Sequence, residues 1–398
     1  MANGESPARR ICVVTGCRAD YGLLYRVMRD LKGRSEIDLQ VLVTGAHLAP
    51  RFGETASLIE ADGFAIDARV PMDLASDQPT AIARALGSAV GGIAEAFENL
   101  KPDVVVVLGD RYEILAAAQA ALILGLPLAH IHGGELTLGA IDDAMRHAVT
   151  KMAQLHFVAA DAYRKRVIQL GESPDRVHLV GALALDNIAG QDLPDRHSLG
   201  KKIGTPLEQG DYFLITYHPA TRGKLAPGAA IGELLAALDG FPDHRMLVTG
   251  VNADPGRDAV SGAIHAWATE RGDTAVVVEN LGQQRYLAAM KHCAAVVGNS
   301  SSGLLEAPAL GVPTVNVGDR QAGRLRAASV IDCAEDAAAI GEAIARATSP
   351  AFRAATADAP YPFGTPGAAR RICDILAAVP LAELRSKGFH DLPVEQTA

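Results

Sequence analysis

The chain has 398 residues, of which 49% are hydrophobic, so it can bury two ordinary cores and is too long for one compact domain. Its formal net charge of −9 argues against a nucleic-acid or anionic-membrane surface, so local arginines and helix ends would have to hold any phosphate ligand. Five cysteines without zinc-type pairing, a polar N-terminus and the lack of a long apolar run predict a soluble, cytoplasmic protein with free thiols.

Short apolar runs alternate with longer Ala/Leu-rich stretches of helical character. The runs are continuous and not alternating, which indicates strands covered on both faces, as in parallel sheets. The predicted strands cover residues 11–15, 39–44, 104–108, 128–131, 156–159, 177–180, 212–216, 245–249, 275–278, 294–297, 314–317 and 330–332. Repetition of strand and helix then predicts an α/β fold with two doubly wound, Rossmann-like parallel sheets.

A stretch poor in apolar residues separates the two sets of strands. We expect an N-terminal domain over residues 1–190, a linker over 191–211 and a nucleotide-binding C-terminal domain over 212–365. Residues 366–398 are expected to form an amphipathic helix, from about residue 368 to 379, and a tail that packs back on the N-terminal domain. Open α/β sheets bind ligands at the carboxyl ends of their strands, so two such sheets facing each other would enclose a ligand in a cleft.

Charged side chains follow the first and third predicted strands. Arg18 lies just before a helix start, where its guanidinium and the helix dipole could act together on a phosphate. The sequence around it lacks the G-x-G-x-x-G fingerprint of dinucleotide-binding loops. Asp110 and Arg111 follow the third strand and could instead form a structural ion pair.

The fourth strand ends in the sequence HIHGGE, which places His132 and Glu135 around a Gly-Gly turn, and Asp142 opens the segment that follows. Two histidines and several carboxylates could suggest metal ligation. However, the H-E-x-x-H spacing is missing, and two ligands at i and i+2 do not define a site. We therefore expect no metal.

In the second half, an apolar run breaks into the loop GNSSSG at residues 298–303, which opens a helix at about Ser302. Backbone N–H groups and hydroxyls at a helix N-terminus form an anion site, and Glu306, one turn further on, can reach a pair of ribose hydroxyls. Alone, the loop is equally consistent with serines that cap the helix. Three polar residues, His218, Asn252 and Arg320, follow other strands of this half.

Together and in this order, these motifs resemble the hydrolysing UDP-N-acetylglucosamine 2-epimerases of sialic-acid and related nonulosonic-acid biosynthesis. The likeness runs from about Ile11 to Val379 and implies the two-domain glycosyltransferase-B type fold. It implies that the serine loop holds the diphosphate and that the following glutamate holds the ribose. The nucleotide-binding residues implied by the resemblance are Arg18, Arg111, His218, Asn252, Ser300, Ser301, Glu306 and Arg320.

The reaction implied by the resemblance inverts C2 of an N-acetylated sugar, where no neighbouring carbonyl acidifies the C–H bond. The available route is elimination of UDP, followed by addition of water to the unsaturated intermediate, which gives N-acetylmannosamine and UDP without NAD or a metal. Positive groups and N–H donors would stabilise the leaving diphosphate, and carboxylates would stabilise the cationic ring and transfer protons. The candidate catalytic residues are Asp110, Glu135, Asp142, His132 and His218.

One position departs from the family pattern. Other branches carry a glutamate at the position of His132, so this histidine takes that role, or Glu135 or Asp142 does. Non-hydrolysing epimerases tend to read HVEAGLR at this motif, so HIHGGE favours the hydrolysing branch.

Alternatives within the same fold remain open. The substrate could be a UDP- or GDP-linked 2,4-diacetamido sugar, and a nucleotide-sugar glycosyltransferase or a non-catalytic sensor would use the same nucleotide site. The expected partners are the nucleotide sugar, the UDP product and other copies of the chain in a dimer or tetramer, for which the Ala-rich helix over 114–124 offers a suitable face.

Overall fold

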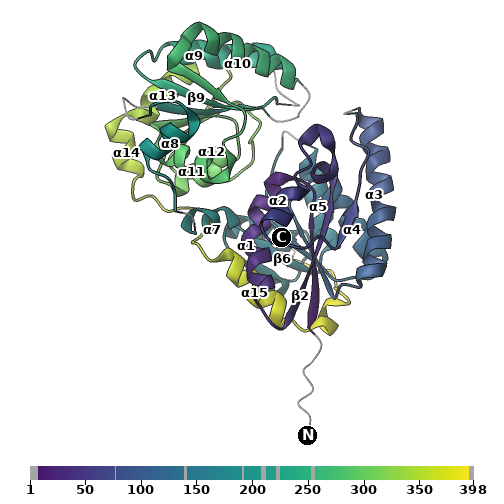
Figure 1. Cartoon of the computed structure of the whole chain (residues 1–398). Coiled ribbons are helices and arrows are strands. Elements are labelled where there is room, and N and C mark those ends of the chain that lie inside the picture. Colours follow the sequence, from purple (N-terminus) through teal and green to yellow (C-terminus); the bar gives the residue numbers. More distant parts are fainter. Residues whose placement is uncertain are drawn as a thin grey trace. The chain divides into compact units, whose positions relative to one another are not determined.

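The computed structural model describes residues 8–76, 78–138, 141–190, 192–207, 212–220, 225–251 and 256–393 (Figure 1). The chain divides into two compact units. Unit 1 comprises the described residues of Met1–Glu135, Ile141–Asn187 and Gly364–Ala398. Unit 2 comprises those of Leu136–Ala140 and Ile188–Phe363.

Unit 1 contains a seven-stranded parallel sheet with the order β3-β2-β1-β4-β5-β6-β7. Its strands are β1 (Arg9–Thr15), β2 (Ile37–Thr44), β3 (Ala68–Val70), β4 (Val104–Leu108), β5 (Leu128–Ile131), β6 (Leu155–Val158) and β7 (Val177–Leu179). The strand order reverses between β1 and β4, where ligands bind in open α/β sheets. The sequence did not predict β3, because only Val70 of its three residues is buried.

Helices cover both faces of this sheet (Figure 1). Helices α3, α4 and α5 share one hydrophobic cluster with the sheet, and α1, α2 and α15 share the other. The helices of this unit are α1 (Arg18–Lys32), α2 (Ala56–Ala61), α3 (Pro79–Leu100), α4 (Tyr112–Ile123), α5 (Asp142–Met152), α6 (Asp161–Gln169) and α15 (Ala368–Ala378). Helix α7 (Leu183–Ala189) begins in unit 1 and ends in unit 2.

Unit 2 contains a six-stranded parallel sheet with the order β10-β9-β8-β11-β12-β13. Its strands are β8 (Tyr212–Thr216), β9 (Arg245–Thr249), β10 (Ala275–Val278), β11 (Ala295–Gly298), β12 (Thr314–Val317) and β13 (Val330–Cys333). Helices α9 (Pro227–Asp239), α10 (Arg257–Arg271) and α13 (Ala337–Thr348) cover one face, and α8 (Arg196–Ile203), α11 (Gly282–His292) and α12 (Ser302–Ala309) cover the other (Figure 1). The predicted fold class of two doubly wound α/β units is confirmed.

The remaining elements are short. Helix α14 (Pro350–Thr356) follows α13 in unit 2. The 3-10 helices are η1 (Gly45–Leu48), η2 (Pro50–Phe52), η3 (Pro174–Arg176), η4 (Gly272–Thr274) and η5 (Leu381–Leu384). Among the described residues, no helix combines the length and hydrophobicity that crossing a membrane requires.

The stretch expected to be a linker contains helix α8. The Asp195 carboxylate caps its N-terminus by accepting the Ser198 N–H at 2.7 Å, and Gly204 ends it with a left-handed backbone. Leu199 is fully buried in the cluster that also contains Leu207 and residues of α11. The sequence did not reveal this helix because few of its residues are apolar.

The Ala-rich helix α4 was expected to offer a face for another copy of the chain, but most of its residues are buried within unit 1. Its residues Ile114, Ala116, Ala117, Ala118, Ala120 and Ala121 are fully buried, in the cluster shared with α3 and α5. Only its C-terminal end exposes large apolar side chains, at Leu122 and Ile123.

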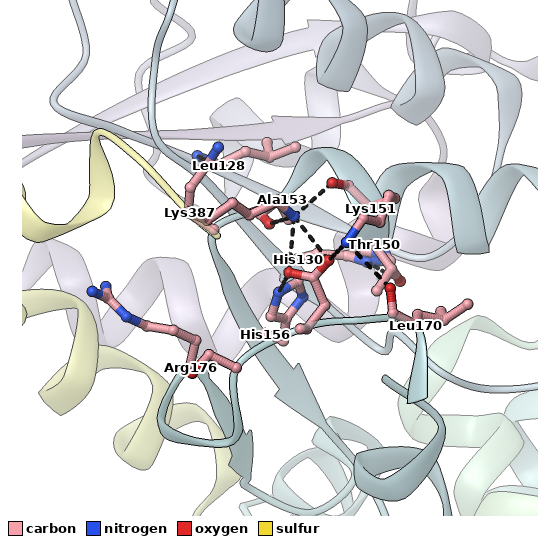
Figure 2. A network of polar contacts seen from close by, with 12 residues as sticks. Leu128, His130, Thr150, Lys151, Ala153, His156, Leu170, Arg176 and Lys387 are labelled. Atoms are coloured by element: carbon pink, nitrogen blue, oxygen red, sulfur yellow. Dashed lines mark hydrogen bonds and ion pairs between the residues drawn. The ribbon is translucent and has the colours of Figure 1, made fainter. Parts of the chain in front are cut away.

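The C-terminal segment returns to unit 1. Ile372 and Leu376 of α15 are fully buried against Leu24 and Met28 of α1. At the other end of the segment, Lys387 donates to the Lys151 carbonyl at 2.5 Å and to the Ala153 carbonyl at 2.6 Å. Figure 2 shows Lys387 and Lys151 pointing toward His156.

Glu172 is the centre of this cluster. Its buried carboxylate accepts from Lys151 at 2.7 Å, from Lys387 at 2.8 Å and from the His156 ring at 3.0 Å. Burial alone would raise the pKa of Glu172, but these three hydrogen bonds outweigh it and hold the pKa at about 2. The C-terminal segment, through Lys387, therefore completes a buried ionic cluster between the last turn of α5 and the start of β6.

Candidate active site

The loop after β5 turns sharply enough to fold Glu135 back onto His132. The His132 N–H still donates to the Phe157 carbonyl at 2.9 Å, as in the sheet, but its φ is +65°. Gly134 follows with φ +77°, and a Cβ there would lie 2.5 Å from the Tyr163 carbonyl oxygen, so only glycine fits. As a result, Nδ1 of His132 lies 2.7 Å from Oε1 of Glu135.

Arg146 ties this loop to the end of β4. Its side chain is 2% exposed, and its guanidinium donates to the Glu135 carbonyl at 3.0 Å while forming an ion pair with Asp110. A second carboxylate, Asp143, lies 3.7 Å from the same guanidinium. The structure thus brings together Asp110, His132 and Glu135 as predicted, and it places Asp142 at the first position of α5, one turn before Arg146.

His130 has a structural role beneath the loop. Its ring contacts the Gly109 carbonyl at 2.7 Å and the Thr150 hydroxyl at 3.1 Å. Complete burial lowers the pKa of His130 to about 3, so the ring is neutral at neutral pH. It joins the ends of β4 and β5, which carry Asp110 and His132.

Arg111 pairs with Glu113, a residue that the sequence analysis gave no role. Nε of Arg111 lies 2.5 Å from Oε1 of Glu113, and this carboxylate raises the pKa of Arg111. Glu113 is fully buried beneath Gly16, where a Cβ would lie only 2.2 Å from Cγ of Glu113. Glu113 thereby holds Arg111 at the carboxyl end of β4 while filling the space under the loop after β1.

The N-terminus of α1 already meets a carboxylate of the protein. Asp20 accepts from the N–H groups of Gly16 at 2.9 Å, Cys17 at 2.8 Å and Tyr21 at 3.0 Å. Arg18 is exposed at the first position of the helix, so its guanidinium is accessible to a phosphate there. The spacing of Cys17 and Asp20 is that of a capping box, which could have revealed this role.

Asn299 organises the serine loop of unit 2. Its side chain accepts the His218 N–H and donates to the His218 carbonyl, both at 2.8 Å. Its own carbonyl accepts from Gln321 at 2.9 Å and from Arg320 at 3.3 Å. One buried amide therefore joins the loops after β8, β11 and β12, and the sequence analysis had assigned it no function.

Gly298 makes the close approach of these loops possible. Its φ is +141°, and a Cβ there would lie 2.1 Å from the Thr216 carbonyl oxygen. His218 is buried beside Arg320, and burial first, then this positive charge, lowers the pKa of His218 to about 3. His218 is therefore neutral at neutral pH, and it can donate a hydrogen bond to a phosphate but does not bring a positive charge.

Helix α12 begins at Ser302, where the sequence predicted it. The Ser300 and Ser302 hydroxyls lie 3.0 Å apart, and the Ser302 hydroxyl lies 2.5 Å from the Tyr286 hydroxyl. Ser301 precedes the helix, and Glu306 lies half-buried one turn inside it. Tyr286 was missed because nothing in the sequence links it to the loop.

The predicted residues thus gather at the carboxyl ends of two sheets. Asp110, Arg111, His132 and Glu135 follow strands of unit 1, and His218, the serine loop and Arg320 follow strands of unit 2. Asn252 lies outside the described residues. Within the described ranges, no group of three or more His, Cys, Asp or Glu side chains is placed to hold a metal ion.

Comparison with known proteins agrees with this architecture. The family model of UDP-N-acetylglucosamine 2-epimerase matches residues 29–377. The GDP/UDP-N,N'-diacetylbacillosamine 2-epimerase (hydrolyzing) of Campylobacter jejuni is 40% identical over 324 residues, which are 81% of this chain and 84% of that protein. The polysialic acid biosynthesis protein P7 of Escherichia coli is 39% identical over 325 residues, which are 81% of this chain and 82% of that protein.

The fold also matches a solved structure. UDP-N-acetylglucosamine 2-epimerase of Neisseria meningitidis, bound to UDP-N-acetylglucosamine, superposes with a TM-score of 0.77 at 18% identity and covers 92% of this chain and 99% of that one. This likeness confirms the expected glycosyltransferase-B type fold. On the family match and the two similar sequences, the chain belongs to the UDP-N-acetylglucosamine 2-epimerase family.

Proposed function

We propose that the protein is a hydrolysing 2-epimerase that converts a nucleoside diphosphate-linked 2-acetamido sugar and water into the free C2-epimerised sugar and the nucleoside diphosphate. The observation that carries this proposal is the 40% identity, over most of both chains, to a relative whose name states this hydrolytic reaction. The carboxylates and histidine gathered after β4 and β5 supply the acid–base groups that such a reaction needs.

We propose UDP- or GDP-linked N,N'-diacetylbacillosamine as the first substrate, because this sugar is named for the Campylobacter jejuni relative. UDP-N-acetylglucosamine is the second candidate. The similarity to a polysialic acid biosynthesis protein favours it, since sialic acids are built from the N-acetylmannosamine that its epimerisation would release.

In the proposed mechanism, the nucleotide is bound by residues of unit 2. Ser300, Ser301 and the N–H groups in the first turn of α12 donate hydrogen bonds to the diphosphate, and Glu306 accepts hydrogen bonds from the ribose hydroxyls. Arg320 and the neutral His218 stabilise the leaving diphosphate, one by charge and the other by a hydrogen bond. Further contacts are assigned to Arg18, Arg111 and Asn252.

The sugar chemistry is assigned to residues of unit 1. The C1–O bond breaks and its electron pair leaves with the diphosphate, while a base takes the C2 proton and a C1=C2 double bond forms. Water then adds its oxygen to C1, and a proton returns to C2 from the opposite face. Asp110, Glu135, Asp142 and His132 are the candidates for charge stabilisation and proton transfer.

Incubation without any acceptor tests the proposal. UDP- and GDP-linked diacetylbacillosamine and UDP-N-acetylglucosamine are each supplied alone, and nucleoside diphosphate and free sugar are quantified by chromatography. Equal amounts of nucleoside diphosphate and C2-epimerised sugar support the proposal, and the preferred donor identifies the substrate. Release that requires an added acceptor would instead indicate a glycosyltransferase, and binding without turnover would indicate a sensor.

A further inference from the structure

We propose that the ring of His132 is the group that removes the C2 proton, and that Glu135 is its positioning residue. The proposal rests on the 2-epimerase function proposed above and deepens it, because it selects one atom, Nε2 of His132, from a set of candidate acids and bases.

The first observation is the direction of the hydrogen bond between the two side chains. A carboxylate can only accept, so the contact of 2.7 Å between Oε1 of Glu135 and Nδ1 of His132 places a proton on Nδ1. In a neutral imidazole, Nε2 then carries the lone pair and is the basic atom. The geometry therefore fixes which ring nitrogen can take up a proton.

The second observation is the state of that atom. Nε2 of His132 is buried and has no hydrogen-bond partner within the described part of the chain. The neighbouring His130 differs, because both of its ring nitrogens contact groups of the protein. A buried polar atom without a partner is costly and usually has a functional explanation, and a bound substrate would supply the missing contact here.

The third observation is the backbone conformation of His132. His132 adopts φ +65°, and the other described non-glycine residues with positive φ are Glu54 and Lys101. Glycine adopts this conformation without the steric cost that a residue with a Cβ bears. Backbone strain of this kind occurs at functional sites, where a particular side chain is needed. His132 bears it directly after the buried strand β5.

Two arginines contact the backbone of the loop that carries His132 and Glu135. Arg146 of α5 pairs with Asp110 from the end of β4 and faces Asp143 on its own helix. Arg146 also donates to the backbone carbonyl of Glu135. Arg166 of α6 likewise donates to the Gly134 carbonyl.

The proposed step breaks the C2–H and C1–O bonds and forms the C1=C2 double bond. Nε2 of His132 takes the C2 proton while the C1–O electron pair leaves with the diphosphate, and the imidazolium that forms is stabilised by the Glu135 carboxylate. Because the product is inverted at C2, the proton that later arrives at C2 comes from solvent by way of a different group on the opposite face. Asp110 and Asp142 remain the candidates for that second transfer.

Chemical rescue tests the proposal. His132→Gly accepts the left-handed backbone and leaves space for a small base, so turnover should fall by roughly 10²- to 10⁴-fold and should recover in part when imidazole is added. His132→Asn also fits the backbone but offers no base and no space, so it should be equally slow and should not respond to imidazole. UDP affinity, measured by calorimetry, should be unchanged in both variants.

Glu135→Gln tests the positioning role. The glutamine amide can donate to Nδ1 and so favour the tautomer that lacks a lone pair on Nε2, which should lower kcat by roughly 10²-fold or more while KM stays the same. In the combined His132→Gly, Glu135→Gln variant, added imidazole should still restore activity, because free imidazole does not depend on Glu135 for its orientation. A purely structural role of Glu135 would prevent this rescue.

His178→Gln is the matched control, because it removes a half-buried histidine from β7, two strands from β5 in the sheet order, and should leave kcat unchanged. Near-normal turnover by His132→Asn would overturn the proposal, as would a slow His132→Gly variant that imidazole does not restore. If wild-type protein fails to convert any sugar of the donor panel, the proposed function itself is wrong, and this outcome is distinct from failure of the histidine assignment alone.

Discussion

Asn299 is the residue on which the serine loop depends most. Replacing it with alanine removes both hydrogen bonds to the buried backbone of His218 and leaves those groups without partners. We expect Asn299→Ala to lower the free energy of unfolding by about 2–4 kcal/mol in urea denaturation. Asn99→Ala, at an exposed position of α3, should change it by less than about 0.5 kcal/mol. Equal stability of the two variants would contradict this role.

Glu306 tests the nucleotide site separately. We expect Glu306→Ala to weaken UDP binding by about 1–3 kcal/mol, because a carboxylate that accepts two ribose hydroxyls loses a charge-assisted pair of hydrogen bonds. Calorimetric titration with UDP measures this loss. The matched control is Glu342→Ala on the exposed face of α13, which should bind UDP like wild type. Unchanged UDP affinity of a folded Glu306→Ala protein would remove Glu306 from the site.

Gly16 tests the packing of the loop after β1. Its missing side chain leaves room for Glu113, and an added Cβ would lie 2.2 Å from Cγ of that buried residue. Gly16→Ala should therefore destabilise the protein by about 1–3 kcal/mol, whereas Gly87→Ala, which meets open space on α3, should stabilise it by about 0.4–1 kcal/mol. Thermal unfolding measures both changes.

The same contact gives a sharper check by a double-mutant cycle. If the clash with Glu113 is the cause, Glu113→Ala should remove most of the extra cost of Gly16→Ala, so that the two changes are strongly coupled. Additive effects of the two substitutions would mean that Gly16 is needed for another reason.

The sequence identified the candidate catalytic residues better than it identified the residues that hold their loops in place. Asp110, His132 and Glu135 were found because charged groups after buried strands meet at one edge of a sheet. Glu113, Asn299 and Tyr286 were given no role, because the residues they contact, Gly16, His218 and Ser302, are distant in sequence. Asp20 was overlooked although its partners lie within four residues and its spacing from Cys17 is that of a capping box. His218 was recognised, but its neutral state depends on burial, which the sequence does not report.

The contact of the C-terminal segment with Glu172 makes the stability of the fold depend on pH in the acidic range. The folded pKa of Glu172 is about 2, against an ordinary value of 4.5, so its hydrogen bonds stabilise the fold fully above pH 4.5. This stabilisation is lost as the pH falls from 4.5 toward 2, because protonation then favours the unfolded chain. We expect the urea midpoint to fall across this window in wild type and to fall less in Glu172→Gln.

An exposed glutamate provides the control for this effect. Glu98→Gln on α3 should keep the wild-type dependence of the urea midpoint on pH. An identical acid dependence in Glu172→Gln would mean that the cluster around Lys387, Lys151 and His156 does not carry this part of the stability.

The elements themselves were predictable to different degrees. Central strands such as β4 and β8 were found at the observed residues because fully buried strands are continuous apolar runs. The edge strand β3 and helix α8 were missed, because an edge strand or a surface helix needs only one or two buried side chains. The start of α12 at Ser302 was predicted because the loop chemistry marks a helix N-terminus.

For the whole molecule, the order of elements along the chain was enough to predict two parallel α/β units, because continuous apolar strands that alternate with helices leave few other solutions. The substrate was not predictable in the same way. It depends on side chains that contact the sugar substituents, and neither the motifs nor the fold names those contacts. Measurement must therefore decide between diacetylbacillosamine and N-acetylglucosamine donors.

Product formed in D2O shows whether the C2–H bond of the sugar is broken during the reaction. Wild-type protein is incubated with UDP- or GDP-linked diacetylbacillosamine and, separately, with UDP-N-acetylglucosamine, and the free sugar is examined by NMR. Elimination followed by hydration requires a new hydrogen at C2, so we expect a C2-epimerised sugar that carries deuterium at C2, released in equal amount with the nucleoside diphosphate. A released sugar that keeps its original configuration and protium at C2 would contradict it.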